Sequence, residues 1–256
     1  MGLKVEKKNR IVYITLDRPE AANAMDMEIL EGLDKALREY RDDDDLRACI
    51  ITGAGPKVFS AGVDLKKISG FILENRLKPW RMPVSMWRGT ELWKPLIAAI
   101  NGMAAGAGLE LALACDLRIA VDTARFAFPE VMLGDFPGWG GAQRLARFVP
   151  QCKAAEMLML GLPMDAQEAY RIGMINKVVP ADQLMKAAEE WALRLTEGAP
   201  LAMKAIKEGI IRGAALPIDE GLSLEWKMIE PCLGSDDIQE ATRAFLEKRK
   251  PSFKGK

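Results

Sequence analysis

One apolar stretch, residues 95–121, constrains the fold of this chain more than any other segment. It reads PLIAAINGMAAGAGLELALACDLRIAV and combines long hydrophobic runs with three glycines and a single glutamate, Glu110. Its length and its Gly102-xxx-Gly106 spacing are compatible with a transmembrane helix. Four polar or charged residues interrupt it, however, and the sequence offers no second such stretch. We therefore expect a buried segment of a globular protein and no membrane partner.

The same stretch also resembles a nucleotide-binding turn. A strand over 96–100, three glycines from position 102 and a following helix match the glycine pattern of short-chain dehydrogenases, and Asp122 lies where a ribose-binding acid would be. Those enzymes need a catalytic Tyr-xxx-Lys. None of the three tyrosines of this chain is followed by lysine four positions later. The oxidoreductase interpretation therefore lacks its proton donor.

The third interpretation is a site for an oxyanion. Small residues let a ligand approach the backbone closely, and a helix that begins near Gly108 would point its free amides at that ligand. Glu110 would lie in the first helical turn among apolar neighbours, where burial disfavours the charged carboxylate and raises its pKa. A glutamate that merely stabilises a helix N-terminus is the alternative that the residues leave open.

The complete absence of histidine makes carboxylates the natural groups for proton transfer. Without histidine, Ser-His-Asp catalysis, Cys-His catalysis and histidine-bound zinc are all excluded. A second acid, Glu130, lies in the segment FAFPEVMLGDFPGWGG, again among apolar residues before a Gly/Pro-rich loop. Alone it is compatible with an ordinary turn carboxylate. Together with Glu110 it predicts a pair of partly desolvated acids with different roles.

Charge, cysteine usage and the N-terminal sequence indicate which partners, metal sites and cellular compartment to expect. The 36 basic and 36 acidic residues balance to a net charge of zero, which argues against nucleic acid or a membrane surface as partner. The four cysteines form no CxxC pair, so we expect no metal cluster and a reducing compartment. The segment MGLKVEKKNR lacks the apolar core of a signal peptide, and we expect a cytoplasmic protein.

Short strands and helices alternate in the first part of the chain, and helices alone follow from about Asp182. This order predicts an α/β core with a helical C-terminal part. The expected elements are a hairpin over 4–17, a helix over 25–41 capped by Asp26, strands over 48–52, 95–100, 117–121 and 175–179, and helices over 182–198, 200–212, 218–230 and 236–249.

Four segments of the chain resemble the crotonase (enoyl-CoA hydratase/isomerase) superfamily, and the resemblance runs over essentially the whole length. They are PKVFSAGVDLKK, KPLIAAINGMAAGAGLELALACDLRIA, FAFPEVMLGDFPGWGGAQRLAR and EATRAFLEKRKPSF. The resemblance implies a spiral of ββα units over residues 1–195 that carries the CoA site and the active site. It implies a helical oligomerisation part over 196–256, with a homotrimer or a dimer of trimers as the assembly.

The resemblance also implies which residues carry the reaction. The family's two oxyanion amides fall on Val63 and Ala107, and its two hydratase glutamates fall on Glu110 and Glu130. Gly138 falls on a loop glycine that helps to place the water. No cofactor is implied, because coenzyme A is part of the acyl-CoA thioester substrate.

Two further segments are implied in binding coenzyme A. One wraps the adenine and pantetheine and consists of Lys57, Ala61, Val63, Asp64 and Leu65. The other reaches a CoA held by a neighbouring subunit and consists of Phe245 and Lys248. Nearby cations could meet the CoA phosphates, namely Lys66, Lys67, Arg249 and Lys250, although solvated lysines are the ordinary alternative.

The chain departs from the family pattern in ways that bear on the acyl group. Ala107 replaces the usual glycine, so the turn must accept a Cβ. Asp135 could point inward as a third carboxylate or outward into solvent. Trp139 could narrow the acyl pocket, as could aromatic and methionine residues in the variable acyl-pocket region: Trp80, Met82, Met86, Trp87 and Trp93. An aromatic lining would suit a cyclic or short branched acyl chain.

Both acids together favour hydration of a 2-enoyl-CoA to a 3-hydroxyacyl-CoA, or the reverse dehydration. Double-bond isomerases of the family typically keep only the acid at the Glu130 position. Enoyl-CoA or dienoyl-CoA isomerisation, a hydratase for cyclic enoyl-CoA or dienoyl-CoA substrates, and a non-catalytic CoA-binding subunit are the alternatives. The last would leave two acids in apolar surroundings unexplained.

Overall fold

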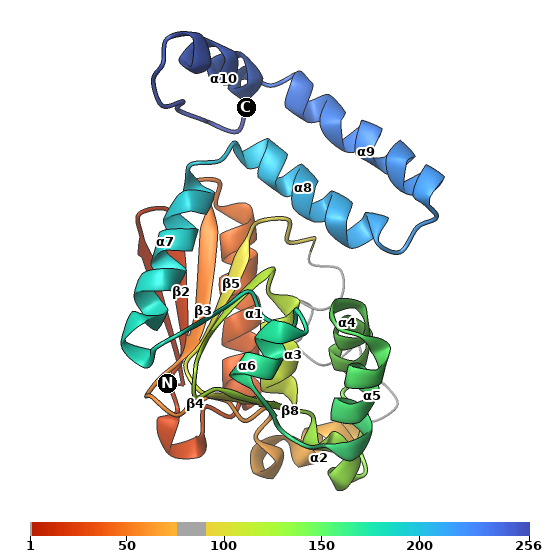
Figure 1. Cartoon of the computed structure of the whole chain (residues 1–256). Coiled ribbons are helices and arrows are strands. Elements are labelled where there is room, and N and C mark those ends of the chain that lie inside the picture. Colours follow the sequence, from red (N-terminus) through yellow and green to blue (C-terminus); the bar gives the residue numbers. More distant parts are fainter. Residues whose placement is uncertain (1, 76–90) are drawn as a thin grey trace.

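Two β-sheets form the body of the protein, whose computed structural model describes residues 2–75 and 91–256 (Figure 1). The larger sheet has the strand order β1-β2-β3-β5-β7-β10 and is parallel apart from the β1–β2 hairpin. Its strands are β1 (Leu3–Lys8), β2 (Ile11–Leu16), β3 (Ala48–Gly53), β5 (Leu96–Ile100), β7 (Leu117–Val121) and β10 (Lys177–Val179). The smaller sheet, in the order β4-β6-β8-β9, contains β4 (Val58–Ser60), β6 (Met103–Ala105), β8 (Arg125–Ala127) and β9 (Met164–Asp165).

Successive parts of the chain place one strand in each sheet and then a helix. β3 and β4 precede α2 (Leu65–Asn75), and β5 and β6 precede α3 (Ala107–Ala114). β7 and β8 precede a 3-10 turn and then α4 (Gly141–Phe148) and α5 (Gln151–Leu160). Each repeat adds a parallel neighbour to both sheets, so the chain winds as a spiral of ββα units. The predicted fold class is therefore confirmed.

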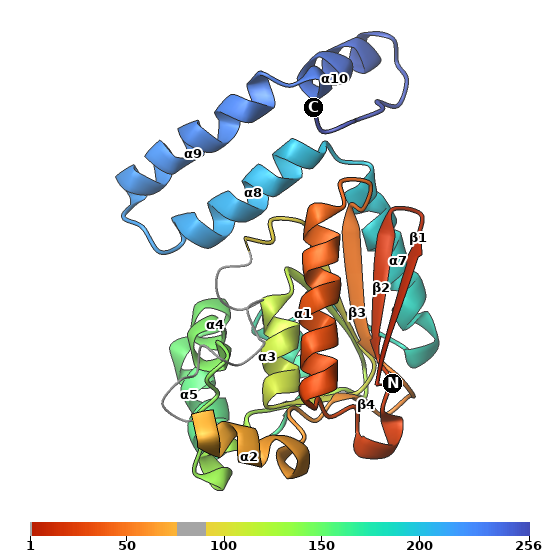
Figure 2. The same ribbon diagram turned by 180° about the vertical axis from the view of Figure 1, so that it is seen from behind.

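The larger sheet is buried on both faces, which explains the nearly continuous apolar sequence of its central strands. β3 pairs with β5 in a register that places Ile50 beside Ile97, and both residues are inaccessible to solvent. The helices α1 (Met27–Asp42) and α7 (Leu184–Thr196) cover opposite faces of this sheet (Figures 1 and 2). The Ile29 N–H donates to Asp26 Oδ1 at 3.1 Å, so the predicted cap of α1 is confirmed.

The apolar stretch 95–121 is not a single helix. It forms β5, β6, the turn at Gly106, α3 and β7, and therefore crosses both sheets within 27 residues. The transmembrane interpretation is thus wrong for this stretch, and within residues 2–75 and 91–256 no helix is both long and apolar enough to cross a membrane. The strand preceding the turn and the helix following it were predicted. β6 between them was not, because three residues are too short to show a period.

Helices α8 (Pro200–Gly213), α9 (Ile218–Leu233) and α10 (Asp236–Leu246) close the chain and project from the core (Figures 1 and 2). Lys207 on α8 anchors them, since its Nζ lies 2.8 Å from Asp116 Oδ2 and donates to the carbonyl oxygen of Lys94 at 2.8 Å. α10 ends three residues earlier than predicted, just before Lys248 adopts a φ of +54°. The division at residue 195 stays a prediction; the short helix α6 (Ala166–Arg171) completes the core.

Candidate active site

Glu110 lies in the first turn of α3, as predicted. The turn before this helix depends on Gly106, whose φ of +52° and ψ of −130° disfavour residues with a side chain. The chain thereby turns sharply from β6 into α3, and the Glu110 N–H donates to the Gly106 carbonyl at 3.0 Å. Every residue from Ala107 to Leu113 is buried, and Glu110 is only 3% exposed.

Two backbone amides of the next loop hold the Glu110 carboxylate. Trp139 N–H and Gly141 N–H donate to Glu110 Oε1 at 2.7 Å and 2.8 Å. Gly141 permits this approach: a Cβ at that position would lie 2.7 Å from Cε1 of Phe128 and 3.0 Å from Glu110 Oε1. The loop that follows Glu130 in sequence therefore orients Glu110, and the two predicted acids belong to one structural unit.

Burial raises the pKa of Glu110 to about 7. The amides of Gly141 and Trp139 and the guanidinium of Arg144 act in the opposite direction, while the nearby charge of Glu130 adds to the rise. A carboxyl group with this pKa exchanges protons readily near neutral pH, which is the property expected of a general acid or base.

Glu130 lies in the 3-10 turn Pro129–Leu133 and approaches the same turn of the backbone. Its Oε1 lies 3.0 Å from the position that a Cβ on Gly106 would occupy. Its Oε2 is buried and has no hydrogen-bond partner within the described part of the chain. Burial raises the pKa of Glu130, and the charge of Asp135 contributes to that rise. A buried carboxyl oxygen without a partner is costly, and sites of chemistry are where such groups occur.

The three other residues predicted in this loop have different positions. Asp135 is exposed and accepts the Phe136 N–H at 2.7 Å, so it points outward and acts on Glu130 only through its charge. Gly138 is exposed next to Trp139, and its role with water stays a prediction. Trp139 is partly buried against the core and supplies its backbone amide to Glu110, a contribution that its side chain did not indicate.

The two predicted oxyanion amides lie on neighbouring backbones. Val63 forms a parallel bridge with Met25, whose N–H donates to the Gly62 carbonyl and whose carbonyl accepts the Asp64 N–H, both at 2.8 Å. These bonds leave the Val63 N–H on the opposite side of its strand. Ala107 supplies the first amide of α3, which has no acceptor within the helix. A Cβ on Gly62 would lie 3.2 Å from the Ala107 nitrogen, so the two segments are adjacent.

The methyl of Ala107 is accommodated without strain, because the positive φ falls on the preceding Gly106 and not on Ala107. The segment from Lys57 to Leu65 lies beside these amides, with Lys57 and Leu65 exposed and Ala61 partly buried. The carboxylate of Asp64 accepts a hydrogen bond from Arg18 Nη2 at 3.0 Å. Its predicted contact with CoA stays a prediction.

The C-terminal residues predicted to bind CoA lie far from this site within one chain. Phe245 is 83% exposed at the end of α10, which lies at the opposite end of the molecule from α2 in both views (Figures 1 and 2). Lys248 is exposed as well. Several cations expected near the phosphates already have carboxylate partners: Lys67 with Asp26, Arg249 with Glu240 and Glu247, and Lys250 with Glu197.

Of the residues expected in the variable acyl-pocket region, Trp93 is the one that lies within the described residues. Trp93 lies against α8, where the guanidinium of Arg212 stacks 5.1 Å from its ring centre. It therefore packs between the core and α8, and a role in the acyl pocket stays a prediction. Trp87 lies outside the described residues, as do Trp80, Met82 and Met86.

Arg144 is a site residue that the sequence did not reveal. It lies on α4, its Nη1 donates to the Trp139 carbonyl at 3.0 Å, and it packs directly on Gly140. It therefore holds the loop whose amides bind Glu110, and its charge lowers the pKa of Glu110. The only sequence signal was an arginine three residues beyond the Gly140-Gly141 pair that ends the segment containing Glu130.

Removing the Arg144 charge should move the pH at which Glu110 titrates. In Arg144→Met the pKa of Glu110 loses a lowering contribution, so the curve of kcat/KM against pH should move toward higher pH. Arg144→Lys keeps the charge and should keep the wild-type curve, although loss of the planar fork lowers kcat. Superimposable curves for Met and wild type would show that Arg144 does not act on Glu110.

The family of the protein follows from comparison with known proteins. A model of the enoyl-CoA hydratase/isomerase family matches residues 6–256. The chain belongs to this family. It is 40% identical over 247 residues to a short-chain-enoyl-CoA hydratase of Clostridium acetobutylicum, covering 96% of this chain and 95% of that protein. It is 37% identical to the (E)-benzylidenesuccinyl-CoA hydratase of Thauera aromatica, with both chains covered completely.

Solved structures of family members agree with this fold. The crystal structure of an enoyl-CoA hydratase from Bacillus anthracis superimposes with a TM-score of 0.92 at 37% identity, and each chain is covered completely. The predicted membership of the enoyl-CoA hydratase/isomerase family is therefore confirmed. The agreement extends through the C-terminal helices, since no part of either chain is left unmatched.

Proposed function

We propose that this enoyl-CoA hydratase adds water to a 2-enoyl-CoA with Glu110 and Glu130 as its acid–base pair and with the amides of Val63 and Ala107 as its oxyanion hole. The hydratase activity, that of a hydro-lyase acting on acyl-CoA thioesters, follows from the family and the full-length relatives. The proposal concerns the residues that perform it. One observation carries it: a buried carboxyl, that of Glu110, and a half-buried one, that of Glu130, both with raised pKa values, meet at the turn that begins α3.

Polarisation of the thioester is the first part of the mechanism. The carbonyl oxygen accepts from Val63 N–H and Ala107 N–H, and the positive end of the α3 dipole adds to their effect. Negative charge grows on this oxygen as the enolate forms, so the two amides stabilise the transition state more than the ground state. The β-carbon becomes electrophilic as a result.

Proton transfer is the second part. As the water oxygen bonds to the β-carbon, its proton passes to the Glu110 carboxylate, and the proton of Glu130 passes to the α-carbon. One proton is thus shared by the pair before and after the reaction. Dehydration runs through the same steps reversed, with protonated Glu110 assisting the departing hydroxyl. Burial of Glu110 favours its protonated form in the free enzyme, which suits the reverse direction.

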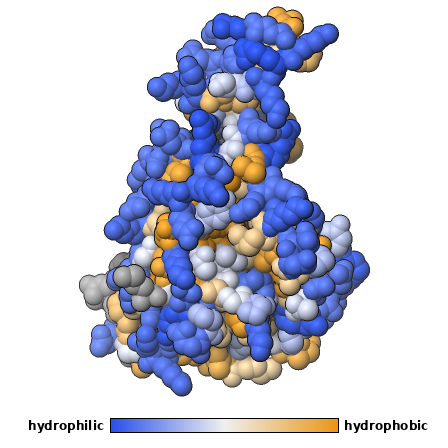
Figure 3. Space-filling model, turned by 90° about the vertical axis from the view of Figure 1, so that its left-hand side faces the viewer, coloured by the Kyte–Doolittle hydropathy of each residue, from blue (hydrophilic) through white to orange (hydrophobic). Residues whose placement is uncertain are grey.

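The proposed CoA site and assembly depend on a second copy of the chain. The segment Lys57–Leu65 would bind the adenine and pantetheine, whereas Phe245 and Lys248 would reach the CoA of a neighbouring subunit. The apolar side chains that remain exposed on the C-terminal helices support a trimer or a dimer of trimers, since so large an unburied area is unusual in a monomer. They include Ile206, Ile210, Ile218, Leu222, Trp226, Leu233 and Phe245, and apolar surface appears on the projecting part in Figure 3.

The proposal is tested with a panel of thioesters. Loss of the conjugated enoyl-thioester absorbance with 2-butenoyl-CoA, and with aromatic and branched enoyl-CoAs, would show hydration and identify the acyl group. The named relatives act on quite different acyl groups, which makes this panel necessary. Movement of the double bond without uptake of water would instead show an isomerase. Binding without turnover across the panel would show a non-catalytic CoA-binding protein.

Removal of one oxyanion amide gives a sharper prediction. Ala107→Pro deletes the N–H at the first helical position, where proline is well tolerated. We expect kcat for hydration to fall by about 10²- to 10³-fold. Ala107→Gly keeps the amide and should retain activity within a few-fold, and free CoA should bind both variants equally. Hydration by Ala107→Pro within tenfold of wild type would exclude this amide from the oxyanion hole.

A further inference from the structure

We infer that Arg18 is a positioning residue for the oxyanion hole, holding the backbone that presents the Val63 amide. The inference rests on the proposed function, because it assumes that this amide binds the thioester oxygen. Arg18 itself lies at the end of the β1–β2 hairpin, 45 residues before Val63 in sequence. Any effect of its side chain on the reaction would therefore be exerted through the contacts of the guanidinium.

The segment that carries Val63 needs an external support. It follows Gly62, which has a φ of +98° and no side chain to restrict it. Its support is the segment 22–26, to which it is joined by a continuous series of hydrogen bonds. Ala61 N–H donates to the Ala22 carbonyl at 3.0 Å, and the Met25 bridge binds both neighbours of Val63. Buried Ser60 adds a third point, donating through Oγ to the Asn23 carbonyl at 2.9 Å.

That supporting segment is itself held in a sparsely populated conformation. Ala22 and Asn23 both have positive φ values, +53° and +52°, which cost energy in residues other than glycine. Arg18 fixes them from two sides. Its backbone N–H donates to Asn23 Oδ1 at 3.0 Å, and its carbonyl accepts the Asn23 N–H at 2.8 Å. The fully buried Asn23 side chain then donates to the Val58 carbonyl at 2.7 Å.

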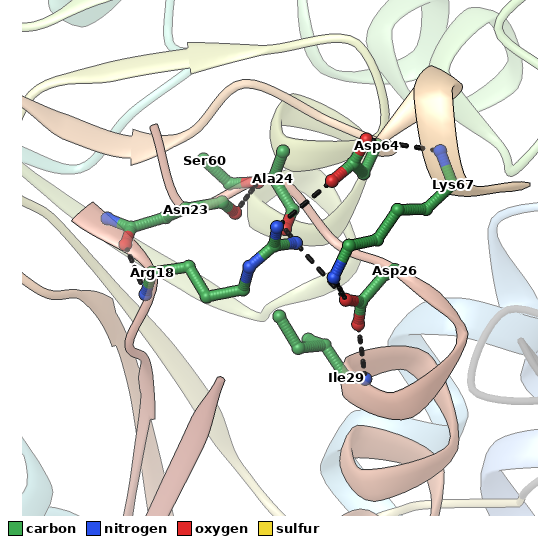
Figure 4. A network of polar contacts seen from close by, with 8 residues as sticks. All are labelled: Arg18, Asn23, Ala24, Asp26, Ile29, Ser60, Asp64 and Lys67. Carbon is green, nitrogen blue, oxygen red and sulfur yellow. Dashed lines mark hydrogen bonds and ion pairs between the residues drawn. The ribbon is translucent and has the colours of Figure 1, made fainter. Parts of the chain in front are cut away.

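The guanidinium of Arg18 joins the support to the Val63 segment directly (Figure 4). Nη1 donates to the Ala24 carbonyl at 2.8 Å and lies 3.3 Å from Asp26 Oδ2, while Nη2 donates to Asp64 Oδ2 at 3.0 Å. Asp64 is the residue immediately after Val63. A planar group with donors in fixed directions can hold three acceptors at once, which a single ammonium cannot do as well. The side chain is 14% exposed, so solvent screening is limited.

Unlike an ordinary surface ion pair, the contacts of the Arg18 guanidinium would control the direction of the Val63 N–H. Loss of the guanidinium contacts removes the tie between Asp64 and the segment 22–26, so the direction of the Val63 N–H would rest on the backbone bonds to Ala22 and Met25 alone. Misplacement of a catalytic group by about 1 Å costs on the order of a hundredfold in rate. Substrate binding through the CoA moiety would change far less, because those contacts do not depend on the direction of one amide.

The test compares Arg18→Met and Arg18→Lys with wild type for hydration of 2-butenoyl-CoA. We expect kcat of the Met variant to fall by about 10- to 100-fold with KM changed less than threefold, and the Lys variant to be intermediate. The infrared stretching frequency of bound butanoyl-CoA, labelled with ¹³C at the thioester carbonyl, should be lowered in wild type and should return toward the free value in Arg18→Met.

Two further variants separate positioning from a loss of folding. Asp64→Asn replaces the charged acceptor of the same guanidinium by a neutral one and should shift the carbonyl frequency in the same direction, and Arg18→Met/Asp64→Asn should be no worse than Arg18→Met alone. Leu184→Ala opens a buried position on α7 and should lower the melting temperature without moving the frequency or kcat.

The outcomes distinguish this inference from the proposed function. An unshifted carbonyl in wild-type enzyme would overturn the oxyanion hole itself. A wild-type shift that persists unchanged in Arg18→Met and Asp64→Asn, with kcat within threefold of wild type, would overturn only the role of Arg18. A kcat loss without a change in carbonyl frequency would likewise overturn it, because such a loss would have another cause.

Discussion

Glu110→Gln should reduce kcat for hydration of 2-butenoyl-CoA by about a thousandfold, the range expected for loss of a general base. Glutamine keeps an oxygen that can accept the Trp139 and Gly141 amides, so the loop should stay in place. What is lost is the ability to take a proton from water. Activity within tenfold of wild type would contradict the two-acid mechanism.

The same substitution should stabilise the protein above neutral pH, in contrast to its effect on activity. The pKa of Glu110 rises from an ordinary 4.5 to about 7 on folding, so the native state holds the proton more tightly than the unfolded state. This contribution to stability is complete below about pH 4.5 and is lost as the pH rises through 7. At pH 8 the variant should exceed wild type by on the order of 1–3 kcal/mol in free energy of unfolding.

Chemical denaturation at pH 5 and pH 8 measures this difference. The advantage of Glu110→Gln should be larger at the higher pH, where wild type must bury the charged carboxylate. Glu168→Gln serves as a matched control, because Glu168 is a carboxylate on the surface helix α6 whose pKa is lowered by its hydrogen bond to Arg171. Glu168 stays ionised in both states between pH 5 and pH 8, so the stability difference between its variant and wild type should not change over this range. An advantage of Glu110→Gln that does not depend on pH would show that titration of Glu110 is not its cause.

Glu130→Gln should reduce hydration at least as strongly, again by about a thousandfold, but for a different reason. Its carboxyl is expected to deliver the proton to the α-carbon, and an amide cannot do so. Its buried Oε2 has no partner among residues 2–75 and 91–256, which indicates an oxygen kept for the substrate and not for the fold. Glu110 does not occupy the position of the Glu130 carboxyl. We therefore expect that it does not take over proton transfer to the α-carbon.

A substitution at Asp135 serves as a control for the negative charge of the loop that follows Glu130. Asp135→Asn removes an exposed carboxylate whose charge raises the pKa of Glu130, while the Phe136 amide can still be accepted by the asparagine oxygen. It should alter kcat only slightly. If Asp135→Asn and Glu130→Gln lose activity to the same extent, then the acid that serves the α-carbon has been misassigned.

Much of the fold could be predicted from the sequence, for reasons that lie in particular segments. The central strands of the larger sheet, such as β3 and β5, are buried runs of β-branched and aliphatic residues, and they were recognised as such. The cap at Asp26 and the turn before α3 follow from local chemistry at each helix start. The strands of the smaller sheet are two or three residues long and are too short to show a period, and helices α4 and α5, which follow a Gly/Pro-rich segment, were not predicted.

The two acids of the site could be predicted from the sequence. The residues that hold the surrounding backbone in place could not. Glu110 and Glu130 stand out because each is a lone charge among apolar residues. Arg18 and Arg144 do not stand out, because arginine is common on surfaces and each acts through partners that folding brings together. Arg18 and Asp64 are 46 residues apart, and the backbone amides that hold Glu110 come from positions 139 and 141. Such pairings have no local signal in one sequence.

Exchange of the α-protons of a saturated acyl-CoA in D₂O tests the central claim most directly, because it needs the oxyanion hole and the α-carbon acid but no addition of water. With butanoyl-CoA as substrate, nuclear magnetic resonance would follow deuterium incorporation at the α-carbon in wild type, Glu110→Gln and Glu130→Gln. The account predicts that Glu110→Gln keeps exchange while losing hydration, and that Glu130→Gln loses both. Exchange that survives in Glu130→Gln and disappears in Glu110→Gln would contradict the assigned roles.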